Sequence, residues 1–174
     1  SEHPELFNIN NGMVPPPDPS GNTPHNGDWM HLNSIDYNPT LDQILISSRF
    51  QNEIYIIDHS TTTQEAATHS GGSSGKGGDF LYRWGNPEKY GLPDNKTLSQ
   101  QHDAQWVKQG YPGEGTITVF NNFQTETSSA VLEIIPPLNE TGTYTLEQNS
   151  GYGPLSATIL YDDSHWNSTT TSFF

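Results

Sequence analysis

Cysteine is absent from this 174-residue chain, which excludes disulfide bonds, thiol catalysis and thiolate metal ligands. Basic residues are few, because Lys and Arg number 6 against 20 Asp and Glu, and the net charge is -14. This balance argues against binding to a nucleic acid backbone or to an anionic membrane surface. No apolar run approaches the ~20 residues of a membrane helix. The first residues, Ser1-Glu2-His3-Pro4, have neither the basic nor the apolar region of a signal peptide.

Apolar residues are also scarce. The hydrophobic fraction is 30%, below the ~45–50% of an ordinary soluble domain. The 16 Gly and 13 Pro residues predict many loops and turns. The chain is nevertheless expected to fold, because 4 Trp, 8 Tyr and 7 Phe supply large side-chain areas for burial. The length fits one domain, or two at most.

Short β-strands are the main element that the sequence predicts. Runs such as Glu53-Ile-Tyr-Ile-Ile-Asp58 are rich in β-branched and aromatic residues. No window of ten or more residues has the 3.6-residue apolar period of a helix. Residues 59–78 are rich in Ser, Thr and Gly and are expected to form a flexible loop. Strands are expected at residues 29–37, 43–48, 53–58, 79–84, 104–107, 116–121, 130–135, 143–148 and 157–161.

Two halves of the chain follow the same plan. The segment 43–51 aligns with 116–124, both ending in Phe-Gln, and a histidine precedes each, His31 in the first case and His102 in the second. A unit of four short strands that repeats is typical of a β-propeller blade. The predicted class is therefore all-β, with blades of four antiparallel strands. The alternative is a self-contained β-sandwich of about eight strands.

The repeat also suggests boundaries. Residues 1–27 are expected to be an irregular N-terminal segment, 28–87 and 88–161 to be two blades, and 162–174 to be the start of a further blade. Two blades cannot close a ring, because closed propellers have about 4–8 of them. The chain is therefore expected to be a fragment of a longer propeller.

Four polar residues form the candidate site. His31 and His102 take equivalent places at the start of a strand in each unit, and such places converge on the central channel of a propeller. Asn33 lies two residues beyond His31 and so shares a face of an ideal strand. Arg49 follows the next strand and is one of only two arginines, with Arg83. A guanidinium, an amide and imidazoles together suit a tetrahedral oxyanion such as sulfate or phosphate.

The same residues have a plainer interpretation. A single strand histidine is more often a hydrogen-bonded structural residue, and an arginine after a strand is more often solvated. His31 and His102 as a pair lack a third ligand at a metal-site spacing, so no metal or cofactor is expected. A structural calcium ion is a minor alternative at Asp162, Asp163 and His165, or at the loop residues Asp18, Asp28 and Asp94.

The stretch Asp28-Trp-Met-His-Leu-Asn-Ser-Ile-Asp-Tyr37, followed by Ile44-Leu-Ile-Ser-Ser-Arg49, resembles the arylsulfate sulfotransferase family. So does Gln101-His-Asp-Ala104 followed by Val119-Phe-Asn-Asn122. Two further segments, Gly75-Lys-Gly-Gly-Asp-Phe-Leu-Tyr-Arg-Trp-Gly-Asn-Pro87 and Gly151-Tyr-Gly-Pro154, are similar to a secreted bacterial branch of that family. The resemblance covers residues 28–161 and implies a six-bladed propeller in the periplasm or outside the cell.

The resemblance also implies an activity. Enzymes of this family move a sulfuryl group from a small phenolic sulfate donor to a phenol acceptor through a transiently sulfated histidine, with no nucleotide donor. By motif match His102 is the nucleophile, and His31, Asn33 and Arg49 hold the sulfuryl oxygens and assist proton transfer. The chain departs from the family in length, since six such blades need more than twice as many residues, and the disulfide of some members is impossible here.

A non-catalytic function remains the alternative. An extracellular β-protein that binds glycans or proteins, or that builds a surface layer or filament, would share the acidic charge and the richness in Thr and Asn. Catalysis requires His31, Asn33, Arg49 and His102 to converge on one pocket, so their positions distinguish the two functions.

Overall fold

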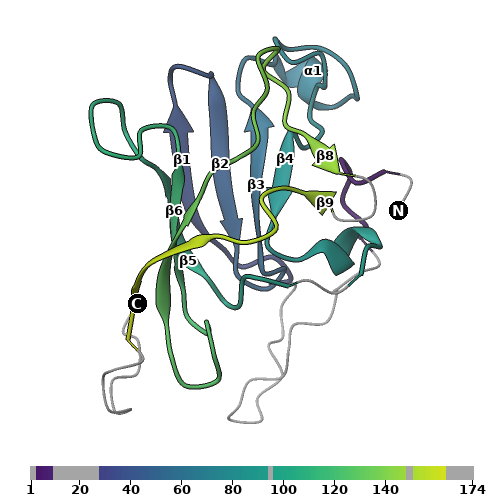
Figure 1. Cartoon of the computed structure of the whole chain (residues 1–174). Helices are drawn as coiled ribbons and strands as arrows, with labels where there is room; N and C mark the ends of the chain where they lie inside the picture. Colours follow the sequence, from purple (N-terminus) through teal and green to yellow (C-terminus); the bar gives the residue numbers. More distant parts are fainter. Residues whose placement is uncertain (1–2, 10–27, 94–95, 148–150, 164–174) are drawn as a thin grey trace.

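The computed structural model describes residues 3–9, 28–93, 96–147 and 151–163, and nearly all of its regular structure is β-strand (Figure 1). Two four-stranded sheets, both antiparallel, account for most of the strands. The all-β antiparallel class predicted from the sequence is therefore confirmed. Residues 10–27 and 164–174 lie outside the described residues, and with them most of the predicted N-terminal segment and most of the predicted further blade.

The first sheet is a meander in which each strand pairs with the next along the chain. Its order is β1-β2-β3-β4. Consecutive apolar residues form its central strands, Ile-Leu-Ile in β2 and Ile-Tyr-Ile-Ile in β3. The turn between β1 and β2 is fixed by Asn38, whose Oδ1 accepts from the main-chain nitrogens of Thr40 and Leu41 at 3.0 and 3.1 Å. The strands are β1 Leu32–Asn38, β2 Gln43–Ser48, β3 Glu53–Asp58 and β4 Tyr82–Trp84.

The second sheet repeats the meander, except that its last strand follows an excursion of the chain. Its order is β10-β7-β6-β5. Its strands are β5 His102–Trp106, β6 Ile117–Asn121, β7 Ala130–Ile134 and β10 Thr158–Asp162. The excursion carries a two-stranded ribbon of β8 Leu146–Glu147 and β9 Gly151–Tyr152, and β9 lies against β4 of the first sheet.

The observed strands match the predicted strand ranges closely in the interior of the sheets and less closely at the strand ends. The predicted strands 43–48 and 53–58 coincide with β2 and β3. The predicted strand 29–37 begins only at residue 32, because His31 adopts a left-handed backbone conformation with φ 48°. In the predicted strand 79–84 only the last three residues are β4. The predicted strand 104–107 begins earlier, which places His102 inside β5.

Residues 59–78 are more ordered than the prediction of a flexible loop. Thr62 and Glu65 form a capping box around the one-turn helix α1, Thr63–Ala66. Farther along, Gly77 and Gly78 donate main-chain hydrogen bonds back to Gly71 and Thr68, both at 3.0 Å. Another short helix is a 3-10 turn at Pro87–Tyr90. No helix among the residues described is long and apolar enough to cross a membrane.

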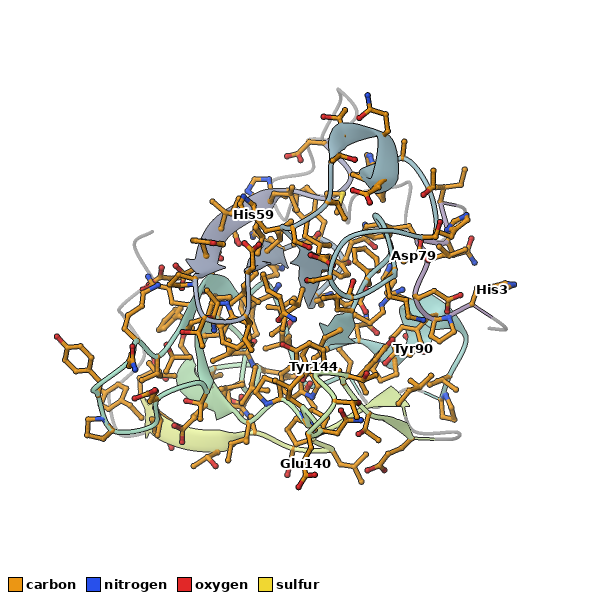
Figure 2. All side chains as sticks on the ribbon, turned by 90° about the horizontal axis from the view of Figure 1, so that it is seen from above. His3, His59, Asp79, Tyr90, Glu140 and Tyr144 are labelled. Atoms are coloured by element: carbon orange, nitrogen blue, oxygen red, sulfur yellow. The ribbon has the colours of Figure 1, made fainter. Side chains whose placement is uncertain are left out.

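The core lies between the two sheets. Large aromatic side chains fill it alongside aliphatic ones, and each fully buried aliphatic side chain contributes about 1.5–3 kcal/mol. Viewed from above, Tyr144 lies between the sheets (Figure 2). Tyr82 and Trp84 donate hydrogen bonds to the carbonyls of Gly153 and Pro154 at 2.8 and 2.6 Å. The core includes Leu45, Ile54, Ile56, Tyr82, Trp84, Leu98, Ala104, Trp106, Ile117, Val119, Leu132 and Ile134.

The sheets approach each other most closely where β1 and β5 lie side by side (Figure 1). Short polar side chains of β1 bind the main chain of β5 there. Ser34 Oγ accepts from the nitrogen of Ala104 at 3.0 Å, and Asp36 Oδ2 accepts from the nitrogen of Trp106 at 2.9 Å. The first strands of the two sheets are therefore joined in a fixed register.

Candidate functional site

The candidate residues gather at one end of the two sheets. His31 directly precedes β1, Arg49 directly follows β2, and His102 opens β5. The antiparallel pairing of Leu32 with Ser48 brings the first two together, and the main-chain nitrogen of Arg49 donates to the His31 carbonyl at 3.1 Å. Since β1 lies beside β5, the start of β5 faces the same end.

His31 is held by an aspartate that the sequence analysis did not include in the site. Asp28 Oδ2 lies 2.6 Å from Nδ1 of the His31 ring, and its Oδ1 accepts from the His31 main-chain nitrogen at 3.0 Å. The hydrogen bond with His31 lowers the pKa of the Asp28 carboxyl. The His31 ring also packs on Phe50, with ring centroids 4.7 Å apart. With Nδ1 bound to a carboxylate, Nε2 of His31 is the nitrogen left to exchange a proton with a substrate.

Arg49 reaches from the first sheet to the loop that leads into β5. Its Nη2 donates to the side-chain oxygen of Gln100. Its guanidinium carbon lies 5.3 Å from the centre of the Phe50 ring, within the range of a cation–π contact. Gln100 is itself anchored, because its main-chain nitrogen donates to Asn52 Oδ1 at 2.8 Å. The only arginine of the candidate site is thus tied to the residues before His102.

His102 is half-buried, and its ring is bound on one side. Nδ1 lies 2.6 Å from Nδ2 of Asn122. Burial lowers the pKa of His102, and the nearby charges of Arg49 and His31 lower it further. A hydrogen bond to the Gln100 carbonyl and the charge of Asp103 oppose that shift. The net effect favours a neutral imidazole, which has a lone pair for nucleophilic attack.

Asn33 links the two sheets. Its Nδ2 donates to the carbonyl of Gln101 at 2.7 Å, so one of its two amide hydrogens is used to hold the residue that precedes His102. Its Oδ1 is buried, with no hydrogen-bond partner among the described residues. The sequence analysis expected Asn33 and His31 to share a face of one strand. That expectation assumes that successive side chains alternate between the two faces, and a register shift between Leu32 and Ser34 interrupts this alternation.

Three of the four predicted residues therefore connect to the segment 100–102, which contains the fourth, His102. Asn33 binds Gln101, Arg49 binds Gln100, and the charges of His31 and Arg49 act on His102. The sequence analysis considered Asp28 only for a minor calcium site and gave no role in the candidate site to Gln100 or Asn122. The sequence holds a signal for two of these residues. Asp28 stands three residues before His31, and Asn122 occupies the same place after its strand as Arg49 does after its own.

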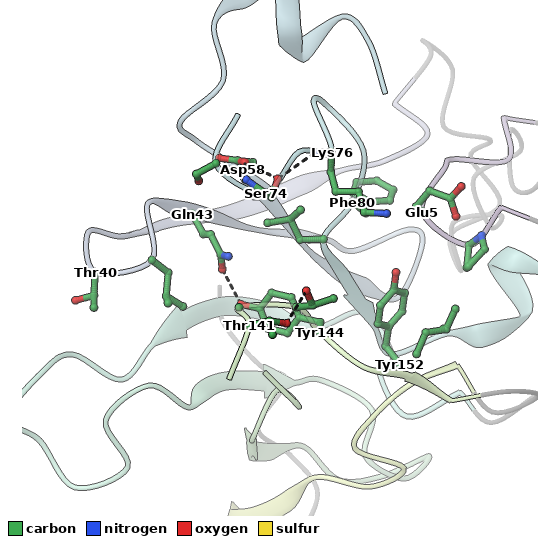
Figure 3. A pocket seen from close by; sticks show the side chains of 17 residues that line it. Glu5, Thr40, Gln43, Asp58, Ser74, Lys76, Phe80, Thr141, Tyr144 and Tyr152 are labelled. Carbon is green, nitrogen blue, oxygen red and sulfur yellow. Dashed lines mark hydrogen bonds between the residues drawn. The ribbon is translucent and has the colours of Figure 1, made fainter. Parts of the chain in front are cut away.

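A cavity of about 490 Å³ lies at the opposite end of the first sheet (Figure 3). Tyr144 donates to Gln43 Oε1 at 2.6 Å on one of its walls, and Ser74 donates to Asp58 on another. None of the four candidate residues lines this cavity. Across the described part of the chain, no group of three or more His, Asp or Glu side chains is arranged to hold a metal ion.

The sequence model of a family described as Arylsulfotransferase (ASST) matches residues 8–133, which is more than two thirds of the chain and includes all four candidate residues. No curated protein matches the chain.

Proposed function

This chain belongs to the arylsulfotransferase family, and we propose that it carries the site at which a sulfuryl group passes from a phenolic sulfate to a phenol through a sulfated His102. The observation that carries the proposal is the connection of Asn33, Arg49 and His31 to residues 100–102 at one end of the sheets. A guanidinium and two imidazoles around one point suit a tetrahedral anion.

The first half of the reaction forms a covalent intermediate. The lone pair of a His102 ring nitrogen attacks sulfur, the bond between sulfur and the aryl oxygen breaks, and the phenolate leaves. His31, oriented by Asp28 at 2.6 Å, donates a proton to the leaving oxygen. Arg49 stabilises the negative charge on the sulfuryl oxygens as they pass through the transition state.

The second half reverses these roles. His31 takes the proton of an acceptor phenol, the phenol oxygen attacks sulfur, and the bond between nitrogen and sulfur breaks. The electron pair of that bond returns to the ring nitrogen, so His102 is neutral again and the cycle closes with the phenolic sulfate as the sulfuryl donor. Because the burial of His102 and the charge of Arg49 lower its pKa, the ring is neutral and nucleophilic near pH 7.

The arrangement of the sheets supports a propeller. Each sheet is a four-stranded antiparallel unit, and the two first strands, β1 and β5, lie side by side. Innermost strands meet in this way around the channel of a propeller, with the outer strands farther apart. We propose that the chain supplies two blades of a six-bladed propeller that acts in the periplasm or outside the cell.

The test is transfer from p-nitrophenyl sulfate to phenol by the full-length protein. Wild type is expected to release p-nitrophenol in a burst followed by steady turnover, and to carry one SO₃ group on His102 when the acceptor is omitted. His102→Asn is expected to lose both. His69→Asn, a matched change at an exposed histidine that binds Asp79, is expected to keep both. Transfer that persists in His102→Asn would overturn the proposal.

A further inference from the structure

Gln101 directly precedes the proposed nucleophile and is fully buried, yet the mechanism above gives it no part. We propose that Gln101 is a positioning residue: it holds His102, in the second sheet, at a fixed place against the turn of the first sheet that carries Arg49. The inference rests on the proposed function of His102 and Arg49, and it adds to that function the residue that sets their separation.

The side chain of Gln101 binds the base of the turn between β2 and β3. Its Nε2 donates to the carbonyl of Ser48, the last residue of β2, at 2.9 Å and to that of Glu53, the first residue of β3, at 3.0 Å. Ser47 Oγ lies 3.1 Å from the same nitrogen. Ser48 and Glu53 pair with each other, and Arg49 is the first residue of the turn that they close. Gln101 therefore binds both ends of the segment that carries the guanidinium.

The residue type at position 101 suits these partners. An amide nitrogen has two hydrogens, one for each carbonyl oxygen, and the opposite orientation of the amide would place Oε1 against both carbonyls. In the observed orientation Oε1 is buried and has no hydrogen-bond partner among the described residues. Burial of an unpaired polar atom costs free energy. The side chain therefore contributes through its donor end.

The main chain of Gln101 binds another part of the candidate site. Its carbonyl accepts from Nδ2 of Asn33 at 2.7 Å, and Asn33 lies two residues beyond His31. Both the side chain and the carbonyl of Gln101 thus reach from the second sheet to the first. A single peptide bond joins this residue to His102, so a displacement of Gln101 also displaces the nucleophile.

The pairing of β5 with its own sheet does not fix this position alone. Gln100 and Asp103 flank the pair Gln101-His102, and both have a left-handed backbone, with φ 50° and 55°. The register of β5 with β6 shifts between His102 and Gln105. The beginning of β5 is therefore irregular, and its place relative to the first sheet depends on bonds between the sheets. Those of the Gln101 side chain are buried.

The separation of His102 from Arg49 matters most in the transition state. The nucleophile and the guanidinium act on the same sulfuryl group, and a misplacement of about 1 Å costs up to about 100-fold in rate. Gln101→Met keeps a long unbranched side chain but removes both donors. We expect kcat to fall about 10-fold to 100-fold in this variant, with little change in KM.

Gln43 offers a matched control at the opposite end of the first sheet. It is also a buried glutamine, and its Oε1 accepts from Tyr144, so it too joins the first sheet to a later part of the chain. Gln43→Met and Gln101→Met are both expected to lower the midpoint of thermal unfolding, but only Gln101→Met is expected to lower kcat. An unchanged kcat in Gln101→Met, or an equal loss in both variants, would overturn the inference.

A double-mutant cycle tests the link to Arg49. If Gln101 aligns Arg49 with His102, Arg49→Met should lower kcat by a smaller factor in Gln101→Met than in wild type. In Gln43→Met the same change should have its full effect. Factors that simply multiply in Gln101→Met would contradict a positioning role. Gln101→Asn, which keeps a buried amide one methylene shorter, takes the place of Gln101→Met in the cycle if the latter does not fold.

A further measurement is independent of activity. Burial lowers the pKa of His102, the charges of Arg49 and His31 lower it further, and the charge of Asp103 opposes them. NMR titration of the full-length protein with labelled histidine, assigned by the signal lost in His102→Asn, reports this pKa. A ring that is displaced from Arg49 should titrate closer to the ordinary value of about 6.5.

The titration is expected to show this rise in Gln101→Met and no change in Gln43→Met. The same His102 pKa in wild type and in Gln101→Met would overturn the inference even if His102 is the nucleophile. Absence of the sulfated intermediate from wild type would instead contradict the proposed function, and the titration would then decide by itself whether Gln101 positions His102.

Discussion

Arg83 and Glu53 form a two-pronged ion pair inside the protein. Arg83 Nε donates to Glu53 Oε1 at 2.9 Å and Nη2 to Oε2 at 2.5 Å, and the side chains are 1% and 0% exposed. Burial raises the pKa of Glu53, and the adjacent guanidinium opposes that rise. The same guanidinium donates to the carbonyls of Pro4 and Leu6, so it also holds the N-terminal segment on the first sheet.

Removal of Arg83 is expected to be costly. Arg83→Met leaves the Glu53 carboxylate buried and unpaired, and the free energy of unfolding should fall by about 3–5 kcal/mol. Urea denaturation followed by tryptophan fluorescence measures the change. The control is Lys108→Met, which breaks an ion pair with Asp36 at a lysine that is 53% exposed and should cost at most about 1 kcal/mol. Equal losses in both variants would contradict this account.

Asp28 is expected to matter for catalysis more than for folding. Asp28→Asn keeps the size of the side chain but removes the carboxylate that orients His31. We expect kcat for sulfuryl transfer to fall about 10-fold to 100-fold, with thermal unfolding nearly unchanged because the pair lies at the surface. Asp42→Asn disrupts an analogous exposed pair with His59 and should leave kcat unaltered. A matching loss in both variants would argue against a role for Asp28 in proton transfer.

Stability should decrease as the pH falls below about 6.5. The pKa of His102 is lowered in the folded protein by burial and by Arg49, whereas in the unfolded chain it is about 6.5. Below that pH the unfolded chain binds the proton more readily than the folded one, so protonation favours unfolding. Denaturation at pH 7 and pH 5 should show a smaller loss in His102→Asn than in wild type. An equal loss would indicate that His102 does not contribute.

Asp36 is expected to hold the two sheets together. Burial raises the pKa of this carboxyl, but hydrogen bonds from Lys108 and from the Trp106 nitrogen lower it overall. Asp36→Leu leaves that nitrogen without its acceptor and should lower the free energy of unfolding by about 1–3 kcal/mol. Asp36→Asn keeps an oxygen at the same place and should cost less. The ranking of the two variants in thermal unfolding checks the prediction.

The sequence predicts the sheet interiors because short-range signals determine them. In β2 and β3 β-branched residues follow one another between turn residues, and the predicted bounds match. The two-residue strand β9, Gly151–Tyr152, falls in the segment Gly151-Tyr-Gly-Pro154, whose two glycines and proline are typical of a turn. Its place depends on contacts with β4, from a distant part of the chain, which local patterns do not record.

The candidate site was predictable in its residue types but not in its contacts. The histidines and Arg49 stand out because cations are rare in this chain. Their partners do not, since Gln100 and Asn122 belong to residue types that are abundant here. The left-handed conformations of His31 and Gln100, with φ 48° and 50°, depend on tertiary hydrogen bonds from Arg49 and to Asn52. No pattern of residue types encodes them.

The hydrogen bonds between β1 and β5 limit where the chain can change in length without displacing the site. Ser34 and Asp36 bind nitrogens of β5 that lie two positions apart, and Asn33 reaches the residue just before that strand. An insertion of one residue between Asn33 and Ser34 would leave the bonds of Ser34 and Asp36 in register but would displace Asn33 from Gln101 and His31 from His102. We therefore expect the site to tolerate insertions and deletions in the outer loops but not where β1 and β5 meet.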